Sequence, residues 1–267
     1  MNGPKVYVDA VGLCGPGLAG WHASRPLLCG TSPYLAAATV IPPSNRLPAA
    51  EKRRVGTPVK LALAVADDAL QSSCCDPSDL LSVFSSSGGD GENCHLICEA
   101  LAGSDRLLSP TRFTNSVHNA PSGYWGIAMQ ARRASTSLCA FDGSFSAGLL
   151  EAATQSVSAQ APVLLIAYDT PYPEPLRTAR PIAQSLGVAL LLSPIATPES
   201  LVALHITLGR RRPDTLADHG FETLRCNVPA ARSLPLLRAL ALGKPGAALS
   251  LDLFSNLQLL LQLGEVR

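Results

Sequence analysis

Short apolar runs of strand length alternate with longer segments of helical character along most of the chain. Strands are predicted at residues 6–11, 80–85, 135–140, 163–167, 187–192, 201–208, 247–253 and 257–263. Helices are predicted at about 57–71, 92–101, 120–131 and 144–156. Because the two kinds of element alternate, the sequence predicts a layered α/β fold with a mixed, largely parallel central sheet.

The chain carries little charge for its length. Charged residues make up 15% of the sequence and hydrophobic residues 47%, whereas an ordinary soluble domain has about 25% charged residues. We therefore expect a partner to cover part of the surface. The formal net charge is +1, and the basic triplet 210–212 is interpreted as a solvated turn, so we expect no nucleic-acid binding. No apolar run reaches the ~20 residues of a membrane span, so we expect no membrane insertion.

Eight cysteines raise the questions of disulfides and metal binding. No secretory signal precedes them, which predicts a reducing, cytoplasmic environment and buried free thiols. Cys94 and Cys98 flank His95, but no second pair with metal-ligand spacing follows. We therefore expect neither a metal nor another cofactor.

The residues around Ser144 carry the richest chemistry. Residues 135–152, STSLCAFDGSFSAGLLEA, are typical of a strand, a tight turn and a helix. This arrangement places the turn residue at a helix N-terminus, where free N–H groups and the helix dipole stabilise negative charge, as in a nucleophile elbow. We interpret Ser144 as the turn residue and expect Cys139 to lie inside the preceding strand.

Five stretches, taken together and in this order, carry a family resemblance. They are residues 6–17, 60–70, 83–91, 108–126 (LSPTRFTNSVHNAPSGYWG) and 135–152. In this combination the chain resembles the β-ketoacyl synthases of the thiolase superfamily, and specifically their short members that cover only the N-terminal half. The resemblance extends over about 1–195. It implies a thiolase-like, ketosynthase N-terminal domain there, with 196–267 as a short C-terminal extension packed on the same domain.

The resemblance implies decarboxylative condensation, in which an elbow cysteine carries the acyl chain and two histidines assist. Ser144 stands where that cysteine belongs, and a serine hydroxyl is a poor nucleophile without an adjacent base. The family's histidines come from a C-terminal half, of which His219, with Gly220 and Thr223, gives only a faint echo of an HGTGT motif. The chain is therefore expected to be a partner subunit that is not catalytic alone.

Chain-length factors, which pair with an active ketosynthase, are the precedent within the superfamily. The resemblance implies a heterodimer or larger complex with an active ketosynthase subunit, served indirectly by an acyl carrier protein, in aryl polyene or fatty-acid-type synthesis. The elbow strand and the loop 109–119 would face the partner. His118 and Asn119 would cap the following helix or line a shared tunnel. The expected tunnel or interface residues are Phe113, His118, Asn119, Cys139, Phe141, Ser144 and Phe145.

A serine hydrolase or acyltransferase is the alternative from another class. Ser144 or Ser146 would be its nucleophile, and Asp169 followed by His205 or His219 satisfies the chain order of an α/β-hydrolase triad. The segment 144–148 departs from GxSxG at its first glycine, and no HGGG-like oxyanion segment precedes it.

Overall fold

One mixed sheet of nine strands forms the centre of the computed structural model, which describes residues 3–182 and 184–266. Its strand order is β4-β3-β5-β6-β1-β7-β9-β8, and the short β2 pairs with β1. The strands are β1 (Lys5–Gly15), β2 (Leu18–Ala19), β3 (Leu81–Ser85), β4 (Ser135–Leu138), β5 (Val163–Asp169), β6 (Leu186–Ser193), β7 (Val202–Gly209), β8 (Ala248–Phe254) and β9 (Leu257–Gly264).

Most strands of the central region run in one direction. Strand β3 pairs in parallel with both β4 and β5. Strand β6 is antiparallel to β5 on one side and to β1 on the other, so β4, β3, β5 and β1 share a direction. The predicted mixed, largely parallel central sheet is thus confirmed. Beyond β1, the strands β7, β9 and β8 continue the sheet in antiparallel pairs.

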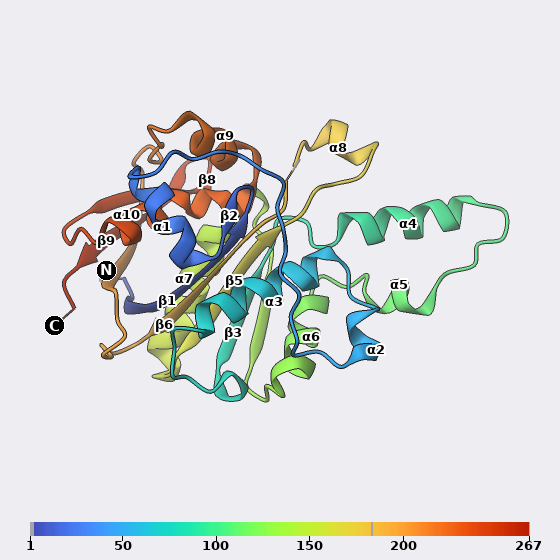
Figure 1. Ribbon diagram of the computed structural model, residues 1–267, viewed down its shortest axis with the longest axis horizontal. Helices are drawn as coiled ribbons and strands as arrows, with labels where there is room; N and C mark the ends of the chain where they lie inside the picture. Colours follow the sequence, from blue (N-terminus) through green and yellow to red (C-terminus); the bar gives the residue numbers. More distant parts are fainter. Residues whose placement is uncertain (1–2, 183, 267) are drawn as a thin grey trace.

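Helices cover both faces of the sheet (Figure 1). On one face, α3 packs on β1, β5 and β6, and α6 packs beside it on β3 and β4, around a shared apolar cluster. On the other face, α1, α7, α9 and α10 enclose a second apolar cluster with the opposite side chains of the same strands. The α-helices are α1 (Trp21–Cys29), α2 (Ala49–Lys52), α3 (Thr57–Leu70), α4 (Gly91–Ala102), α5 (Pro110–Thr114), α6 (Ala120–Met129), α7 (Ser144–Ala159), α8 (Leu176–Ala179), α9 (His219–Asn227) and α10 (Leu234–Leu242). Short 3₁₀ helices are η1 (Pro77–Asp79), η2 (Phe141–Gly143) and η3 (Pro229–Ser233).

The strongly patterned elements lie where the sequence predicts them. All eight predicted strands and all four predicted helices are present, with ends that differ by a few residues. The predicted loop 109–119 contains the short helix α5, for which Ser109 supplies the N-cap through a bond from the backbone N–H of Arg112. Helices α9 and α10 occupy a region in which the sequence predicts no helix. Both carry ordinary start signals, an Asp218 cap and Pro235 in the first turn.

The C-terminal residues share the sheet of the N-terminal ones. Strand β7 pairs with β1, with Lys5 opposite His205 and Val8 opposite Val202. Helix α10 packs against α1 in the apolar cluster on the α7 face. The division at residue 195, with 196–267 as a short extension packed on the N-terminal domain, stays a prediction.

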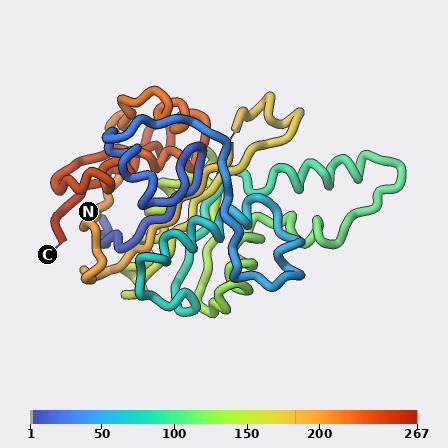
Figure 2. The backbone as a smooth tube through the Cα atoms, in the orientation of Figure 1, coloured from blue at the N-terminus to red at the C-terminus, as the bar shows by residue number. Residues whose placement is uncertain are grey.

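Two irregular segments stand out from the layers. Residues 31–48 run as a long strap across the molecule (Figure 2), and Thr39 Oγ1 fastens the strap by donating to the carbonyl of Ser185 at 2.7 Å. Helices α4 and α5, with the loop between them and the turn that follows, form an arm of residues 91–119 that projects from the body (Figure 1). The arm carries exposed Leu101, Leu107, Phe113 and Val117.

The cysteines differ from the expectation of buried thiols. All eight are free, but only Cys14 is buried, and Cys74, Cys94, Cys98, Cys139 and Cys226 are exposed. Burial raises the pKa of the Cys14 thiol to about 11. Among the described helices, none has both the length and the apolar character that a membrane crossing requires.

The contact between β1 and α3 leaves no room for a side chain at Gly12. A methyl group there would overlap the carbonyl oxygen of Val65. We expect Gly12→Ala to lower the free energy of unfolding by about 2 kcal/mol or more, because backbone cannot yield as a side chain can. Gly123→Ala on α6 is the control, since its new methyl group meets nothing within 4 Å. Urea unfolding with equal stability for Gly12→Ala and the unchanged protein would contradict this packing.

Candidate functional site

The bend between β4 and α7 presents an aromatic side chain to solvent. Phe141 adopts a left-handed backbone conformation, with a φ of 50°, and its side chain is 61% exposed. Such a conformation is strained for a residue with a bulky side chain. Two residues later, the carbonyl of Leu253 on β8 occupies the space that a side chain of Gly143 would need. The bend is therefore clamped from outside by the C-terminal part of the chain.

Ser144 has a structural place in this bend. It is the first residue of α7 and is 2% exposed. Its hydroxyl donates to the carbonyl of Phe141 at 2.7 Å and accepts from the backbone N–H of Ala140 at 3.0 Å. The assignment of Ser144 as the exposed turn residue is thus wrong, since Phe141 holds that position and the hydroxyl closes the bend from inside. Phe145, which follows, is fully buried in the core.

The four bend residues provide no serine- or cysteine-type nucleophile. They are Ala140, Phe141, Asp142 and Gly143, none of which has a thiol or a hydroxyl. The thiol nearest to the bend in the sequence is that of Cys139, which is exposed. Cys139 lies just after β4, so its predicted place inside the strand is wrong. Its Sγ is bonded to the carbonyl of Ser87 at 3.2 Å. The chain thus follows the strand-turn-helix path of a nucleophile elbow, but the turn has no thiol or hydroxyl group.

The glycine-rich turn after β3 is the meeting point of several predicted site residues. Cys139 bonds to the carbonyl of Ser87, and Nε2 of His118 lies 3.3 Å from the carbonyl of Ser86. Asn119 stands at the N-cap position of α6, but its side chain makes no capping bond. The predicted capping by the Asn119 side chain is therefore wrong. Phe113 lies on the arm with its ring exposed.

Asp169, at the end of β5, ties this turn to the C-terminal part of the chain. Its carboxylate accepts from the backbone N–H of Ser87 at 2.9 Å and from that of Ala230 at 2.8 Å. The hydroxyl of Ser87 also donates to it, at 2.5 Å. Complete burial raises the pKa of Asp169 to about 6, and this outweighs the donated bonds, which act in the opposite direction.

These positions do not form a hydrolase triad. Ser146 is fully buried on α7, and its hydroxyl has no hydrogen-bond partner among the described residues. The oxygens of Asp169 are engaged by the turn after β3 and by η3. His205 lies on β7 and His219 is exposed at the start of α9. In the part of the chain that is described, neither histidine bonds to Ser144, Ser146 or Asp169.

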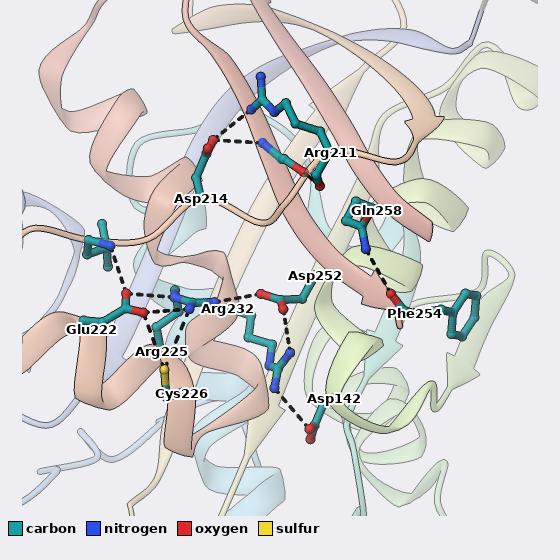
Figure 3. A network of polar contacts seen from close by, with 12 residues as sticks. Asp142, Arg211, Asp214, Glu222, Arg225, Cys226, Arg232, Asp252, Phe254 and Gln258 are labelled. Carbon is teal, nitrogen blue, oxygen red and sulfur yellow. Dashed lines mark hydrogen bonds and ion pairs between the residues drawn. The ribbon is translucent and has the colours of Figure 1, made fainter. Parts of the chain in front are cut away.

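A chain of ion pairs links the bend to the C-terminal segment (Figure 3). Asp142 bonds Arg180 at 2.7 Å and Arg232 at 3.1 Å. Arg232 reaches Asp252 on β8 at 2.9 Å, and Asp252 in turn bonds Arg225 on α9 at 2.8 Å. The series thus alternates in sign through side chains that are half-buried, apart from the buried Arg225, and pairing stabilises such charges far better than isolation would.

The last link of that chain has a strongly perturbed carboxyl. Two nitrogens of Arg225 bond Glu222, at 2.7 and 2.9 Å. These bonds lower the pKa of Glu222 to about 2. The ion-pair chain was not predicted from the sequence, because Asp142 and Arg232 are 90 residues apart and no motif links them.

A polar cleft of about 410 Å³ lies at the base of the arm, beside α3. Its lining mixes the cations Arg53, Lys60 and Arg112 with the carboxyl groups of Asp90 and Glu92. Nowhere in residues 3–182 and 184–266 do three His, Cys, Asp or Glu side chains gather as metal ligands would.

Solved structures with this architecture define the class of fold. A chain of the complex between the ketosynthase ApeO and its chain length factor ApeC from Xenorhabdus doucetiae matches with a TM-score of 0.73 and 22% identity, over 97% of this chain and 99% of that one. A chain of AntDE:AntF, a type II polyketide synthase acyl-carrier protein in complex with its ketosynthase, matches with a TM-score of 0.74 and 11% identity over 99% of both chains. The ishigamide ketosynthase/chain length factor gives a TM-score of 0.72 and 12% identity, over 98% of this chain and 100% of that one. The fold is therefore the thiolase-like fold of the ketosynthases.

The sequence places the chain within a family. Residues 29–248 match the model for the β-ketoacyl synthase N-terminal domain, and the chain belongs to that family. The match continues past residue 195, where the sequence resemblance was expected to stop. No curated protein sequence gives a match.

The raised pKa of Asp169 predicts how stability depends on pH. The native pKa of about 6 lies above the ordinary value of 3.8, so the native state holds this proton more tightly. The resulting stabilisation is fully present below pH 3.8 and is lost as the pH rises through 6. Asp169→Asn removes this dependence, and its amide also has too few acceptors for the N–H groups of Ser87 and Ala230.

Urea unfolding between pH 4 and 7 provides the measurement. We expect the stability advantage of the unchanged protein over Asp169→Asn to shrink by up to about 3 kcal/mol as the pH rises. Asp105→Asn, in an exposed loop, is the control and should leave the pH profile unaltered. A stability difference between protein and Asp169→Asn that stays constant over this pH range would refute the raised pKa.

Proposed function

We propose that this chain is a non-catalytic, chain-length-factor-like subunit that pairs with an active β-ketoacyl-carrier-protein synthase in the cytoplasm. The pair would extend an acyl chain in aryl polyene, fatty acid or polyketide synthesis, with the acyl carrier protein serving the active subunit. One observation carries the proposal. The ketosynthase fold is kept in full around the elbow, while the bend at 140–143 has neither thiol nor hydroxyl.

The structural neighbours support a partner role. Two of them are named as ketosynthase and chain length factor complexes, and a third contains a ketosynthase with its acyl-carrier protein. In each case the similarity spans nearly the whole of the matched chain. A fold shared at 11–22% identity says nothing by itself of partners, so the proposal depends on the surfaces of this chain as well.

The free edge of β4 is the first such surface. Strand β4 ends the sheet, and its other side pairs with β3. The carbonyls of Ala134 and Leu138 accept from β3. Because successive residues of a strand alternate in direction, the backbone groups of Ser135 and Ser137 face outwards. An uncovered row of N–H and C=O groups favours the addition of a strand from another chain.

The arm is the second surface. Four large apolar side chains of the arm are exposed, with Leu107 at 81% and Phe113 at 67%. Exposed apolar side chains grouped in this way are typical of interaction sites, and aromatic rings among them often provide much of the binding energy.

Co-expression with a full-length, active ketosynthase from the same genome, followed by size-exclusion chromatography, tests the partnership. We expect the two chains to co-elute. Ser137→Pro should reduce co-elution at least about tenfold, because proline removes an outward N–H and disfavours strand addition. Ser137→Thr keeps that N–H and should co-elute normally. If the unaltered chains never co-elute, the proposed partnership is wrong.

The serine hydrolase alternative makes the opposite prediction for covalent labelling. A fluorophosphonate probe followed by mass spectrometry should leave Ser144 and Ser146 unlabelled, because both hydroxyls are buried and no histidine in the described chain bonds to either. An acyl-thioester substrate should likewise leave no adduct on the isolated chain. Stoichiometric labelling of either serine would favour the hydrolase instead.

A further inference from the structure

Phe141 combines strain with exposure in a way that packing does not explain. Holding a bulky residue such as Phe141 in a left-handed backbone conformation costs on the order of 1–3 kcal/mol, and such strain persists only where the surroundings impose it. Burial of the ring does not compensate, because 61% of the residue faces solvent. Strained residues of this kind cluster at functional sites. The bend therefore holds Phe141 outwards against its own conformational preference.

One face of the ring is covered by a cation. The guanidinium of Arg180 lies 3.8 Å from the ring centroid, which is the geometry of a cation–π contact. The same guanidinium bonds Asp142, the next residue along the bend, at 2.7 Å. The ring, the guanidinium and the carboxylate thus hold one another, and only the second face and the edge of the ring remain free.

The C-terminal segment fixes this arrangement. Asp142 also binds Arg232, which is anchored on Asp252 of β8. Figure 3 shows both of these ion pairs. The carbonyl of Leu253, the residue after Asp252, lies against Gly143. Charge pairs and backbone contact therefore act together on the four residues of the bend.

We propose that Phe141 is a specificity-determining residue, the ring that meets the far end of the partner's growing acyl chain and limits its length, and that Arg180 is its positioning residue. This rests on the proposed function. The occupant is an apolar acyl or polyene chain, because the free face of the ring is apolar and the Arg180 guanidinium already covers the opposite face. A rigid ring stops a chain more sharply than a mobile aliphatic side chain would.

Product analysis of the reconstituted complex tests the proposal. Phe141→Ala should shift the product distribution towards longer chains by about one two-carbon unit or more, because truncation leaves an unfilled space. Phe141→Trp should shift it towards shorter chains. The opposite signs matter, since general damage to the complex would lower the yield of all products alike.

Variants of the positioning residue complete the set. Arg180→Ala should lengthen the products less than Phe141→Ala does, and Arg180→Lys should restore part of the original distribution because an ammonium also stacks on a ring. Arg177→Ala is the matched control, since Arg177 is exposed nearby and pairs with Glu174 instead. Ile195→Ala, an exposed apolar residue away from the bend, controls for lost apolar surface.

The outcomes separate this inference from the partnership itself. Co-elution with the ketosynthase is measured for every variant, and thermal unfolding confirms that each one folds. If Phe141→Ala fails to fold, Phe141→Leu takes its place. A complex that forms normally but makes the same products with Phe141→Ala and Phe141→Trp overturns the inference and leaves the partnership intact. Loss of co-elution in Phe141→Ala also overturns it, since the ring would then be an interface anchor.

Discussion

The backbone contact between Gly143 and Leu253 is the constraint on which the site depends. No side chain fits between the bend and β8, so the C-terminal strands bound the space in which the bend lies. Asp252, beside Leu253, then stands within reach of Arg232 and so of Asp142. The steric contact sets the distance between the bend and β8, and the ion pairs set the orientation of Asp142 in the bend. An error in either would release the strained backbone of Phe141.

This dependence makes the C-terminal segment part of the elbow. Asp169 ties the turn after β3 to the same C-terminal segment from the core side, through the backbone N–H groups of Ser87 and Ala230. The turn after β3, the bend before α7 and the helix η3 are thus held by residues distant in sequence. In a catalytic relative, such a frame would position reacting groups. Here it holds a phenylalanine ring.

The sequence predicts helices and strands well wherever the pattern of apolar residues determines which side chains are buried. The apolar run 163–167 could only be an inner strand, and β5 is buried along its whole length. The bend was predicted less well, because periodicity does not say which residue of a strand-turn-helix segment faces outwards. Ser144 looked like the exposed residue by its chemistry. Its hydroxyl instead completes the backbone bonding of the turn, as short polar side chains often do.

The proposal that this elbow carries no acyl chain now rests on Phe141 and not on a weakly reactive serine. A serine at the apex would have been a weak nucleophile that a suitable base could activate. Phenylalanine has no atom that could form a thioester or an ester under any arrangement of neighbours. Under the proposed function the rigidity of the bend has no catalytic use, yet a cation and an ion-pair chain hold the bend against the strain of its backbone. A rigid bend keeps the Phe141 ring in one position, and under the proposed function that ring is the surface that a partner's substrate would meet.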